Sequence, residues 1–247
     1  MLDFTWLSHY IIGGAPRVDK RDVVAFLRSF PAKPRFGLLT VPGQTPGAHV
    51  PEHDTRVDKT LEVWDYCFWS GITIDVIHTT GLPDRNGLKG AEYLGRQFKA
   101  FAAARYQDSE TAVLRRHFFT GEAESAYTAE SFLLLKDNFY QADGKGRPRP
   151  LYDAIGLVTN TPHLRVALVY ARRFLPGIRI IGISSGDGRG ALNMPYKDYR
   201  RRERKHLIAA RFLDWNGRFI EVIERDYGKR LRAQCREKEW PSIRVPT

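Results

Sequence analysis

The stretch FTGEAESAYTAESFL, residues 119–133, gathers residues that can bind a ligand or move a proton where a strand-like run meets a helix-like one. Its glutamates can accept hydrogen bonds from ribose or amine groups, or serve as general bases. Thr128 can cap the following helix through its hydroxyl, and Glu130 suits the positive end of the helix dipole. The stretch is therefore either an ordinary helix start or the polar lip of a binding site.

A second candidate group lies in TNTPHL, residues 159–164, after another apolar run. His163 opens a helical pattern there and can act as an acid, a base or a phosphate donor. A single histidine in such a place also serves as a capping or core-edge residue. If protons are transferred, Glu130 and His163 are the candidates for doing so.

These residues must be positioned by elements that alternate along the chain. Strand-like apolar runs occupy 9–14, 36–43, 72–81, 113–121, 154–160 and 178–186, and helical patterns occupy 19–30, 56–69, 88–106, 129–141 and 163–174. Residues 142–150, ADGKGRPRP, are expected to be a loop. The alternation predicts an α/β fold with a Rossmann-like, mainly parallel sheet and helices on both faces.

In such a sheet a ligand binds at the carboxyl ends of the strands, so the residues that follow each strand form the expected cleft. Glycines there let the backbone approach a ligand, and hydroxyls and carboxylates offer hydrogen bonds. The resulting candidates for ligand binding are Gly43, Gln44, Thr80, Gly81, Glu122, Ser125, Thr128 and Thr159.

No metal site is expected. HVPEH, residues 49–53, holds two histidines and a glutamate but contains proline and is expected to be a loop, unlike a helical HExxH motif. Cys67 and Cys235 lie far apart and have no CxxC or Cys/His pattern around them. A glycine-rich turn, IIGGAP at residues 11–16, matches neither the GxGxxG nor the P-loop spacing.

The chain carries a formal net charge of +11 over 247 residues, and its C-terminal part is the more basic. Such a surface attracts phosphates and nucleic acid, which makes nucleic-acid binding the alternative function. Tyr196, Tyr199 and Trp215 can stack on bases. The basic candidates for phosphate contact are Arg200, Arg201, Arg202, Arg204 and Lys205. The RRRERK run is equally typical of a solvated helix face.

Three further expectations concern the whole chain. No apolar run is long enough to span a membrane, and the N-terminus does not read as a signal peptide, so a cytoplasmic location is expected. We expect an N-terminal extension at 1–35 that adds one βα unit, an α/β ligand-binding domain at 36–193 and a basic helical appendage at 194–247. Apolar residues at helical spacing in the appendage leave monomer and homodimer both open.

The opening stretch resembles the signature of the ElyC/SanA/YdcF family, which runs Glu, two residues, Ser, one residue, Asn-Thr, one residue, Glu-Asn. Four residues fall on that spacing, whereas two others replace its asparagines; the four are Glu122, Ser125, Thr128 and Glu130, and the replacements are Tyr127 and Ser131. LVTNTPHLRVALVYARRF resembles the family's LVTS and the helix that follows it. Thr159, His163 and Ala167 match there, while Arg165 sits one place before the family's arginine.

The resemblance adds Arg56, which falls where the family often has an arginine opening a helix, and Arg165 to the ligand-binding candidates. It implies a Rossmann-like domain with a ligand cleft at the strand ends. Some members of the family are reported to bind S-adenosylmethionine. The expected function is therefore that of a soluble YdcF-like protein that binds an anionic or nucleotide-like small molecule, S-adenosylmethionine first among them, as a transferase or hydrolase.

Overall fold

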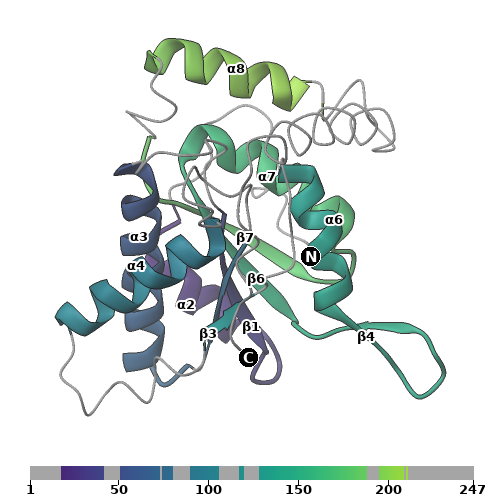
Figure 1. Ribbon diagram of the computed structural model, residues 1–247. Coiled ribbons are helices and arrows are strands. Elements are labelled where there is room, and N and C mark those ends of the chain that lie inside the picture. The colour runs from purple at the N-terminus through teal and green to yellow at the C-terminus, as the bar shows by residue number, and fades with distance from the viewer. Residues whose placement is uncertain are drawn as a thin grey trace, which may run out of the picture.

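A five-stranded sheet forms the centre of the molecule (Figure 1). The computed structural model describes residues 18–41, 51–72, 74–79, 90–105, 117–119, 128–187, 195–208 and 210. The strands are β1 (Phe36–Thr40), β2 (Asp75–His78), β3 (His117–Phe119), β6 (Ala154–Thr159) and β7 (Arg179–Ser184). They lie in the order β3-β2-β1-β6-β7, and each neighbouring pair is parallel. The predicted α/β fold with a mainly parallel sheet is confirmed.

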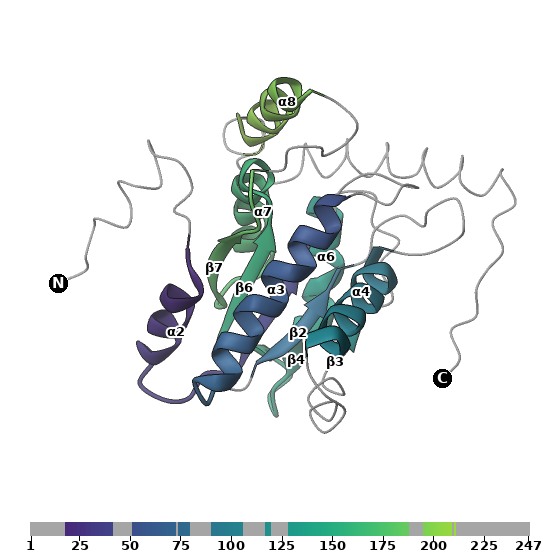
Figure 2. The same ribbon diagram turned by 90° about the vertical axis from the view of Figure 1, so that its left-hand side faces the viewer.

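Helices cover both faces of this sheet (Figure 2). On one face lie α2 (Lys20–Arg28), α3 (Pro51–Trp69) and α4 (Gly90–Arg105). On the other lie α6 (Thr128–Phe139) and α7 (Thr161–Phe174). Successive side chains of a strand point to opposite faces, so a strand covered on both sides must be apolar throughout. All five residues of β1 and all six of β6 are buried accordingly.

The faces of β1 show how this burial is divided. Phe36 and Leu38 belong to the core under α2, α3 and α4, whereas Leu39 belongs to the core under α6 and α7. Gly156 of β6 lies on the first of these faces, where a Cβ would come within 2.7 Å of the Phe36 ring and 2.9 Å of Leu38 Cδ1. Glycine at this position therefore leaves room for the phenylalanine.

Helix α2 belongs to the same packed body, although it falls in the region predicted to be an N-terminal extension. Asp19 begins it with a capping box that pairs Asp19 with Asp22. Val23, Val24 and Leu27 are buried against the core under α3, and Lys20 Nζ lies 3.2 Å from Glu62 Oε1 of α3. Residues 1–17, which include the first predicted strand, lie outside the described part.

Two local predictions were wrong. Residues 142–150 were expected to be a loop, but β4 (Tyr140–Ala142) and β5 (Pro148–Pro150) form an antiparallel hairpin. Asp143 holds its turn, because Oδ1 accepts the backbone N–H groups of Lys145 and Arg147 at 2.8 and 2.9 Å. Those bonds, with the Arg147 guanidinium, lower the pKa of the Asp143 carboxyl. Pro51 to His53 were also expected to be a loop, yet they form the first turn of α3.

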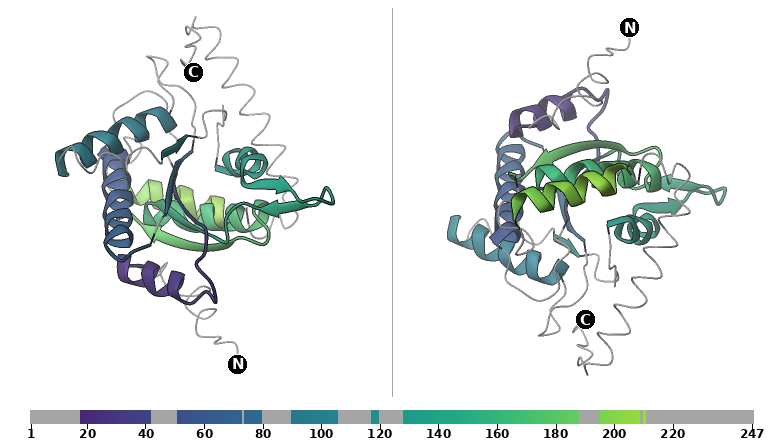
Figure 3. Two further views of the ribbon diagram at one scale, coloured as in Figure 1. Left: turned by 90° about the horizontal axis from the view of Figure 1, so that it is seen from below. Right: turned by 90° about the horizontal axis from the view of Figure 1, so that it is seen from above.

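The basic helix α8 (Tyr196–Ile208) lies at the end of the sheet where β6 and β7 finish (Figure 3). Tyr199 and Glu203 are its buried residues, and they stand one turn apart on the face that meets α7. Leu207, one turn further, packs against the core under α6 and α7. Among the helices of the described ranges, none is both long and apolar enough to cross a membrane.

Candidate functional site

The strand order reverses between β1 and β6. From β1 the chain proceeds outward to β2 and β3, then returns to place β6 on the other side of β1. In open parallel sheets the carboxyl ends of the two strands at such a reversal diverge and form the ligand crevice. The side chains to inspect are therefore those around Val41, after β1, and around Thr159 and Asn160, at the end of β6.

A buried hydroxyl, an imidazole and a carboxylate are linked in a row beside this point. Thr128 Oγ1, in the first turn of α6, lies 3.0 Å from Nε2 of His163, in the first turn of α7. The other ring nitrogen, Nδ1, lies 3.1 Å from Oε2 of Glu203 on α8. The three side chains come from three different helices, and each residue is at most 5 % exposed.

The partners of the His163 ring decide its tautomer. An ionised carboxylate can only accept a hydrogen bond, so Nδ1 carries the proton and donates it to Glu203. In the neutral ring Nε2 is then an acceptor, and the Thr128 hydroxyl donates to it. This is the arrangement that activates a hydroxyl in hydroxyl–histidine–carboxylate hydrolases, with the carboxylate orienting the ring.

Charges around Glu203 keep it ionised although it is buried. Burial by itself raises the pKa of Glu203, but attraction to His163, the hydrogen bond to its ring, and the nearby His206 and Arg202 together lower it below the ordinary value of 4.5. Burial lowers the pKa of His206 below 6.5, against the attraction of Glu203. The carboxylate is thus negative at neutral pH and can stabilise a protonated His163.

Asn160 joins α7, β6 and α8. Its Oδ1 accepts the backbone N–H of His163 at 3.0 Å, which makes Asn160 the N-cap of α7. The same oxygen accepts the hydroxyl of Tyr199 at 2.7 Å. Since a backbone N–H can only donate, the atom facing it must be the oxygen, and the amide nitrogen Nδ2 points elsewhere. Tyr199 is consequently buried and bonded, so the expectation that it stacks on bases was wrong.

Several buried polar atoms at the ends of β6 and β7 have no hydrogen-bond partner in the described part of the chain. They are Thr159 Oγ1, Asn160 Nδ2 and Ser185 Oγ. Thr159 is fully buried and Asn160 is 1 % exposed. Buried polar groups are almost always hydrogen-bonded, because leaving one unsatisfied costs about 1–3 kcal/mol. Two of these atoms, on Thr159 and Asn160, lie at the strand reversal, where a bound polar ligand is one way to satisfy them.

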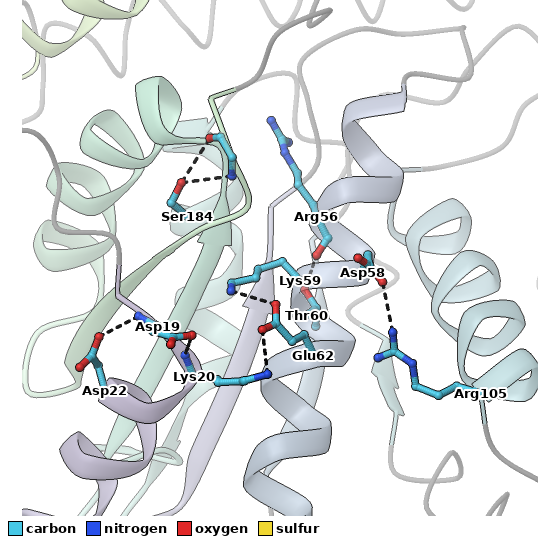
Figure 4. A network of polar contacts seen from close by, with 11 residues as sticks. Asp19, Lys20, Asp22, Arg56, Asp58, Lys59, Thr60, Glu62, Arg105 and Ser184 are labelled. Carbon is cyan, nitrogen blue, oxygen red and sulfur yellow. Dashed lines mark hydrogen bonds and ion pairs between the residues drawn. The ribbon is translucent and has the colours of Figure 1, made fainter.

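Arg56 supplies a buried positive charge on the β1 side of the strand reversal. Its Nη1 donates to the carbonyl of Val41, just after β1, at 2.6 Å, and the residue is 1 % exposed. Its own carbonyl accepts the Thr60 hydroxyl at 2.8 Å, and that hydroxyl pairs with Thr40 on β1. Figure 4 shows the Arg56 side chain extending from α3 toward the end of the sheet where Ser184 lies.

The N-terminus of α7 does not offer its backbone to a phosphate. Thr161 N donates to the carbonyl of Gly186 at 2.8 Å, Pro162 has no N–H, and His163 N donates to Asn160. The loop after β7 therefore closes this helix end. An anion next to the N-terminus of α7 would therefore not be bound by the backbone N–H groups of Thr161 and His163.

The predicted site residues divide into three groups. Four are buried at the carboxyl edge of the sheet: Arg56, Thr128, Thr159 and His163. Arg165 is exposed on α7, away from them. The others lie outside the described residues: Gly43, Gln44, Thr80, Gly81, Glu122 and Ser125. Glu130 belongs to the first turn of α6, but its side chain is outside the described part as well.

Glu203 and Asn160 were not predicted as site residues, and Tyr199 was predicted to stack on bases instead. Glu203 was hidden in RRRERK, which was assigned to solvent or phosphates. A signal was present, since residues 199, 203 and 207 recur at the four-residue spacing that places them on one face of a helix. Asn160 directly before a Thr-Pro pair also has the pattern of a helix N-cap.

Comparison with known proteins adds no relative: no family model, curated protein or solved structure matches the chain. Membership of the ElyC/SanA/YdcF family therefore stays a prediction.

Proposed function

We propose that the protein binds an anionic or nucleotide-like small molecule at the carboxyl ends of β1 and β6, with S-adenosylmethionine as the leading candidate. The observation that carries the proposal is the set of buried, unsatisfied polar atoms at the ends of β6 and β7, next to the Thr128–His163–Glu203 row. The resemblance to the ElyC/SanA/YdcF family, some of whose members are reported to bind S-adenosylmethionine, supports the same ligand.

The residues fit S-adenosylmethionine by their hydrogen-bonding capacity. The Thr159 hydroxyl can pair with a ribose hydroxyl, and the Asn160 Nδ2 group can donate to a ring nitrogen or a carboxylate. Arg56 places positive charge at β1, as a carboxylate requires. When bound, this cofactor supplies a transferable methyl group.

His163 is proposed to act as the base of a transferase or hydrolase. Its Nε2 can take the proton of the Thr128 hydroxyl, and the ionised Glu203 stabilises the imidazolium that results. Glu130 remains a proposed second proton-transfer residue, on the strength of its position in the resemblance.

Thr159→Val tests the binding site. The hydroxyl has no protein partner in the described part, so its loss leaves the melting temperature of the free protein unchanged or raises it. If the hydroxyl binds the ligand, the same change reduces the thermal shift caused by S-adenosylmethionine, measured by scanning fluorimetry over a concentration series. An undiminished shift in Thr159→Val removes Thr159 from the site.

His163→Ala tests whether His163 belongs to the binding site, with Arg204→Ala at an exposed position of α8 as the control. A ligand-induced shift that His163→Ala abolishes and Arg204→Ala preserves supports the proposal. Native mass spectrometry of the freshly purified protein identifies a co-purified ligand, and S-adenosylmethionine loses its leading place if another mass is bound or if neither method detects it.

A second candidate is nucleic-acid binding by α8. Arg200, Arg201, Arg204 and Lys205 are exposed, and their spacing places them on the side of the helix away from Tyr199 and Glu203. Arg202 is half-buried near Glu203 and is a weaker candidate. We propose this as the alternative function, in which phosphates bind along the outer face of α8.

A further inference from the structure

A polar cavity of about 480 Å³ lies at the end of the sheet opposite α8, between the hairpin, the end of α2 and the first residues of three strands. Figure 1 shows the hairpin projecting from this end of the sheet, far from α8. Arg35, Arg149 and Arg179 line the cavity together with Asp153, Phe30 and Tyr152. We call it the arginine pocket. All of its residues belong to the described part of the chain.

The register of the sheet brings these charges together. Arg35 directly precedes β1, Asp153 precedes β6, and Arg179 begins β7. Asp153 N donates to the Arg35 carbonyl at 2.9 Å, and Arg179 N donates to the Asp153 carbonyl at 3.1 Å. Arg149 comes from β5, whose hairpin folds back so that Leu151 N donates to Phe139 O. These backbone contacts therefore fix the position from which each arginine side chain extends.

Aromatic rings orient two of the guanidinium groups. Arg179 lies over the rings of Phe30 and Phe26, at 4.3 and 4.9 Å from their centroids. Arg35 lies 5.8 Å from the centroid of Tyr152. A guanidinium stacked on a ring keeps its N–H edge available, because the stacking uses its face and the donors lie in its plane.

The pocket carries more positive than negative charge. Within the described ranges, none of its three arginines has a carboxylate within 4.0 Å of its guanidinium nitrogens. Asp153, the acid in the lining, accepts the backbone N–H of Arg35 at 2.7 Å through Oδ2. The three arginine residues are exposed, and with Asp153 they give the cavity lining an excess of positive charge that attracts an anion.

We propose that the arginine pocket binds a small molecule that carries two or more anionic groups, phosphates or carboxylates. Guanidinium groups bind both kinds in bidentate fashion. The cavity volume falls in the range of about 300–1,000 Å³ that is usual for small-molecule sites, so it accommodates more than a single phosphate. This site is separate from the strand-end site and does not depend on the function proposed for it.

Isothermal titration calorimetry of the full chain with inorganic pyrophosphate and with citrate tests the proposal and distinguishes phosphate from carboxylate ligands. We expect saturable 1:1 binding of at least one probe. The double variant Arg35→Gln/Arg149→Gln should lose about tenfold or more in affinity, because hydrogen bonds between a guanidinium group and an anion are strong. Arg179 is left in place, because its packing on Phe26 and Phe30 contributes to the fold.

Two controls separate the pocket from the general positive charge. Lys145→Gln/Lys33→Gln makes the same change in net charge at exposed lysines that do not line the cavity, and it should keep most of the affinity. His163→Ala should bind the probe as the unmodified protein does. The proposal is overturned if neither probe gives saturable binding, if the arginine and lysine pairs weaken binding equally, or if binding is lost in His163→Ala and kept in the arginine variant.

Discussion

Glu203 stands between Arg202 and Arg204, yet the three side chains meet different surroundings. Arg204 is exposed and Arg202 is half-buried, whereas Glu203 is 3 % exposed against His163. A buried carboxylate is tolerated only when partners replace the water it loses. His163 provides that replacement, and the basic neighbours add to it, so the acid in this basic run is a component of the candidate site.

Replacing Glu203 by Gln should make the free energy of unfolding less dependent on pH in the acid range. Because the folded pKa of Glu203 lies below 4.5, its contribution to stability is present above about pH 4.5 and is lost as the pH falls through the folded pKa. Glu203→Gln removes that contribution, and we expect a loss of about 1–3 kcal/mol in unfolding free energy at pH 7. Urea unfolding from pH 3 to 8 measures it.

The difference between the two proteins should therefore shrink as the pH is lowered below 4.5. Arg204→Gln, the exposed neighbour, should stay within about 0.5 kcal/mol of the unmodified protein at every pH. A Glu203→Gln difference that is independent of pH would mean that packing, and not the carboxylate charge, is what the substitution removes.

Which site residues could be predicted depended on how local their signals are. Thr128, Thr159 and His163 follow strand-like runs, and a strand end is recognisable from its own neighbourhood. Glu203 belongs to the row only because α8 packs on α7, a tertiary contact across 40 residues. No local pattern states which helix will cover the end of the sheet, so the carboxylate partner of His163 could not be deduced.

At the scale of elements, α8 is attached to the body through polar contacts as much as apolar ones. The Tyr199 hydroxyl bonds Asn160, and Glu203 bonds His163, while Leu207 provides a partly buried apolar contact. The mostly charged sequence of the helix gives little further apolar surface to bury. The free energy of local unfolding of α8 should therefore fall measurably when a single one of these hydrogen bonds is removed.

Tyr199→Phe should loosen α8 selectively. The ring is kept, while the O–H···O bond to Asn160 is lost, at a cost of about 1 kcal/mol. We expect amide hydrogen exchange in residues 196–208 to rise about fivefold and exchange in β6 to stay unchanged. An equal rise in both elements would show that Tyr199 supports the whole domain and not this helix alone.

Gly156→Ala should destabilise the sheet. Its Cβ would meet Phe36 Cζ at 2.7 Å, Leu38 Cδ1 at 2.9 Å and Ile183 Cδ1 at 3.0 Å. Overpacking of this kind costs about 1–3 kcal/mol, which chemical denaturation can measure. Gly144→Ala in the hairpin turn is the matched control, since a Cβ there meets nothing within 4 Å. Equal stability of the two variants would contradict the close packing of β6 on β1.

The elements that could be predicted are those with a strong period or a long apolar run. The five strands of the sheet were expected at the correct places because runs such as AIGLVT are too apolar for anything but a doubly covered strand. The hairpin was missed because its strands have three residues each and β5 is Pro-Arg-Pro. The start of α3 was not predicted because HVPEH contains Pro51, although proline suits a first helical turn.

At the scale of the whole molecule, the two ends of the sheet differ in how their charges are arranged. At the carboxyl edge, Glu203 pairs with His163, and the exposed arginine and lysine side chains of α8 lie on its outer face. At the amino edge, the arginine pocket holds guanidinium groups without carboxylate partners in the described part. Two separate groups of basic residues therefore lie at opposite ends of the sheet of this protein, whose net charge is +11: the outer face of α8 and the arginine pocket.

The basic residues on the outer face of α8 predict a salt-dependent association with nucleic acid. If four cations of α8 contact phosphates, the affinity for single-stranded DNA should fall with salt, with a log–log slope near −3, about −0.7 for each contact. Replacing Arg200, Arg201, Arg204 and Lys205 by Gln should abolish that slope in fluorescence anisotropy between 50 and 200 mM salt. The same change in charge at the exposed Arg21, Lys33, Arg96 and Lys145 should leave most of it. Equal losses in the two variants would attribute the binding to net charge, and no binding at 50 mM salt would exclude this function for α8.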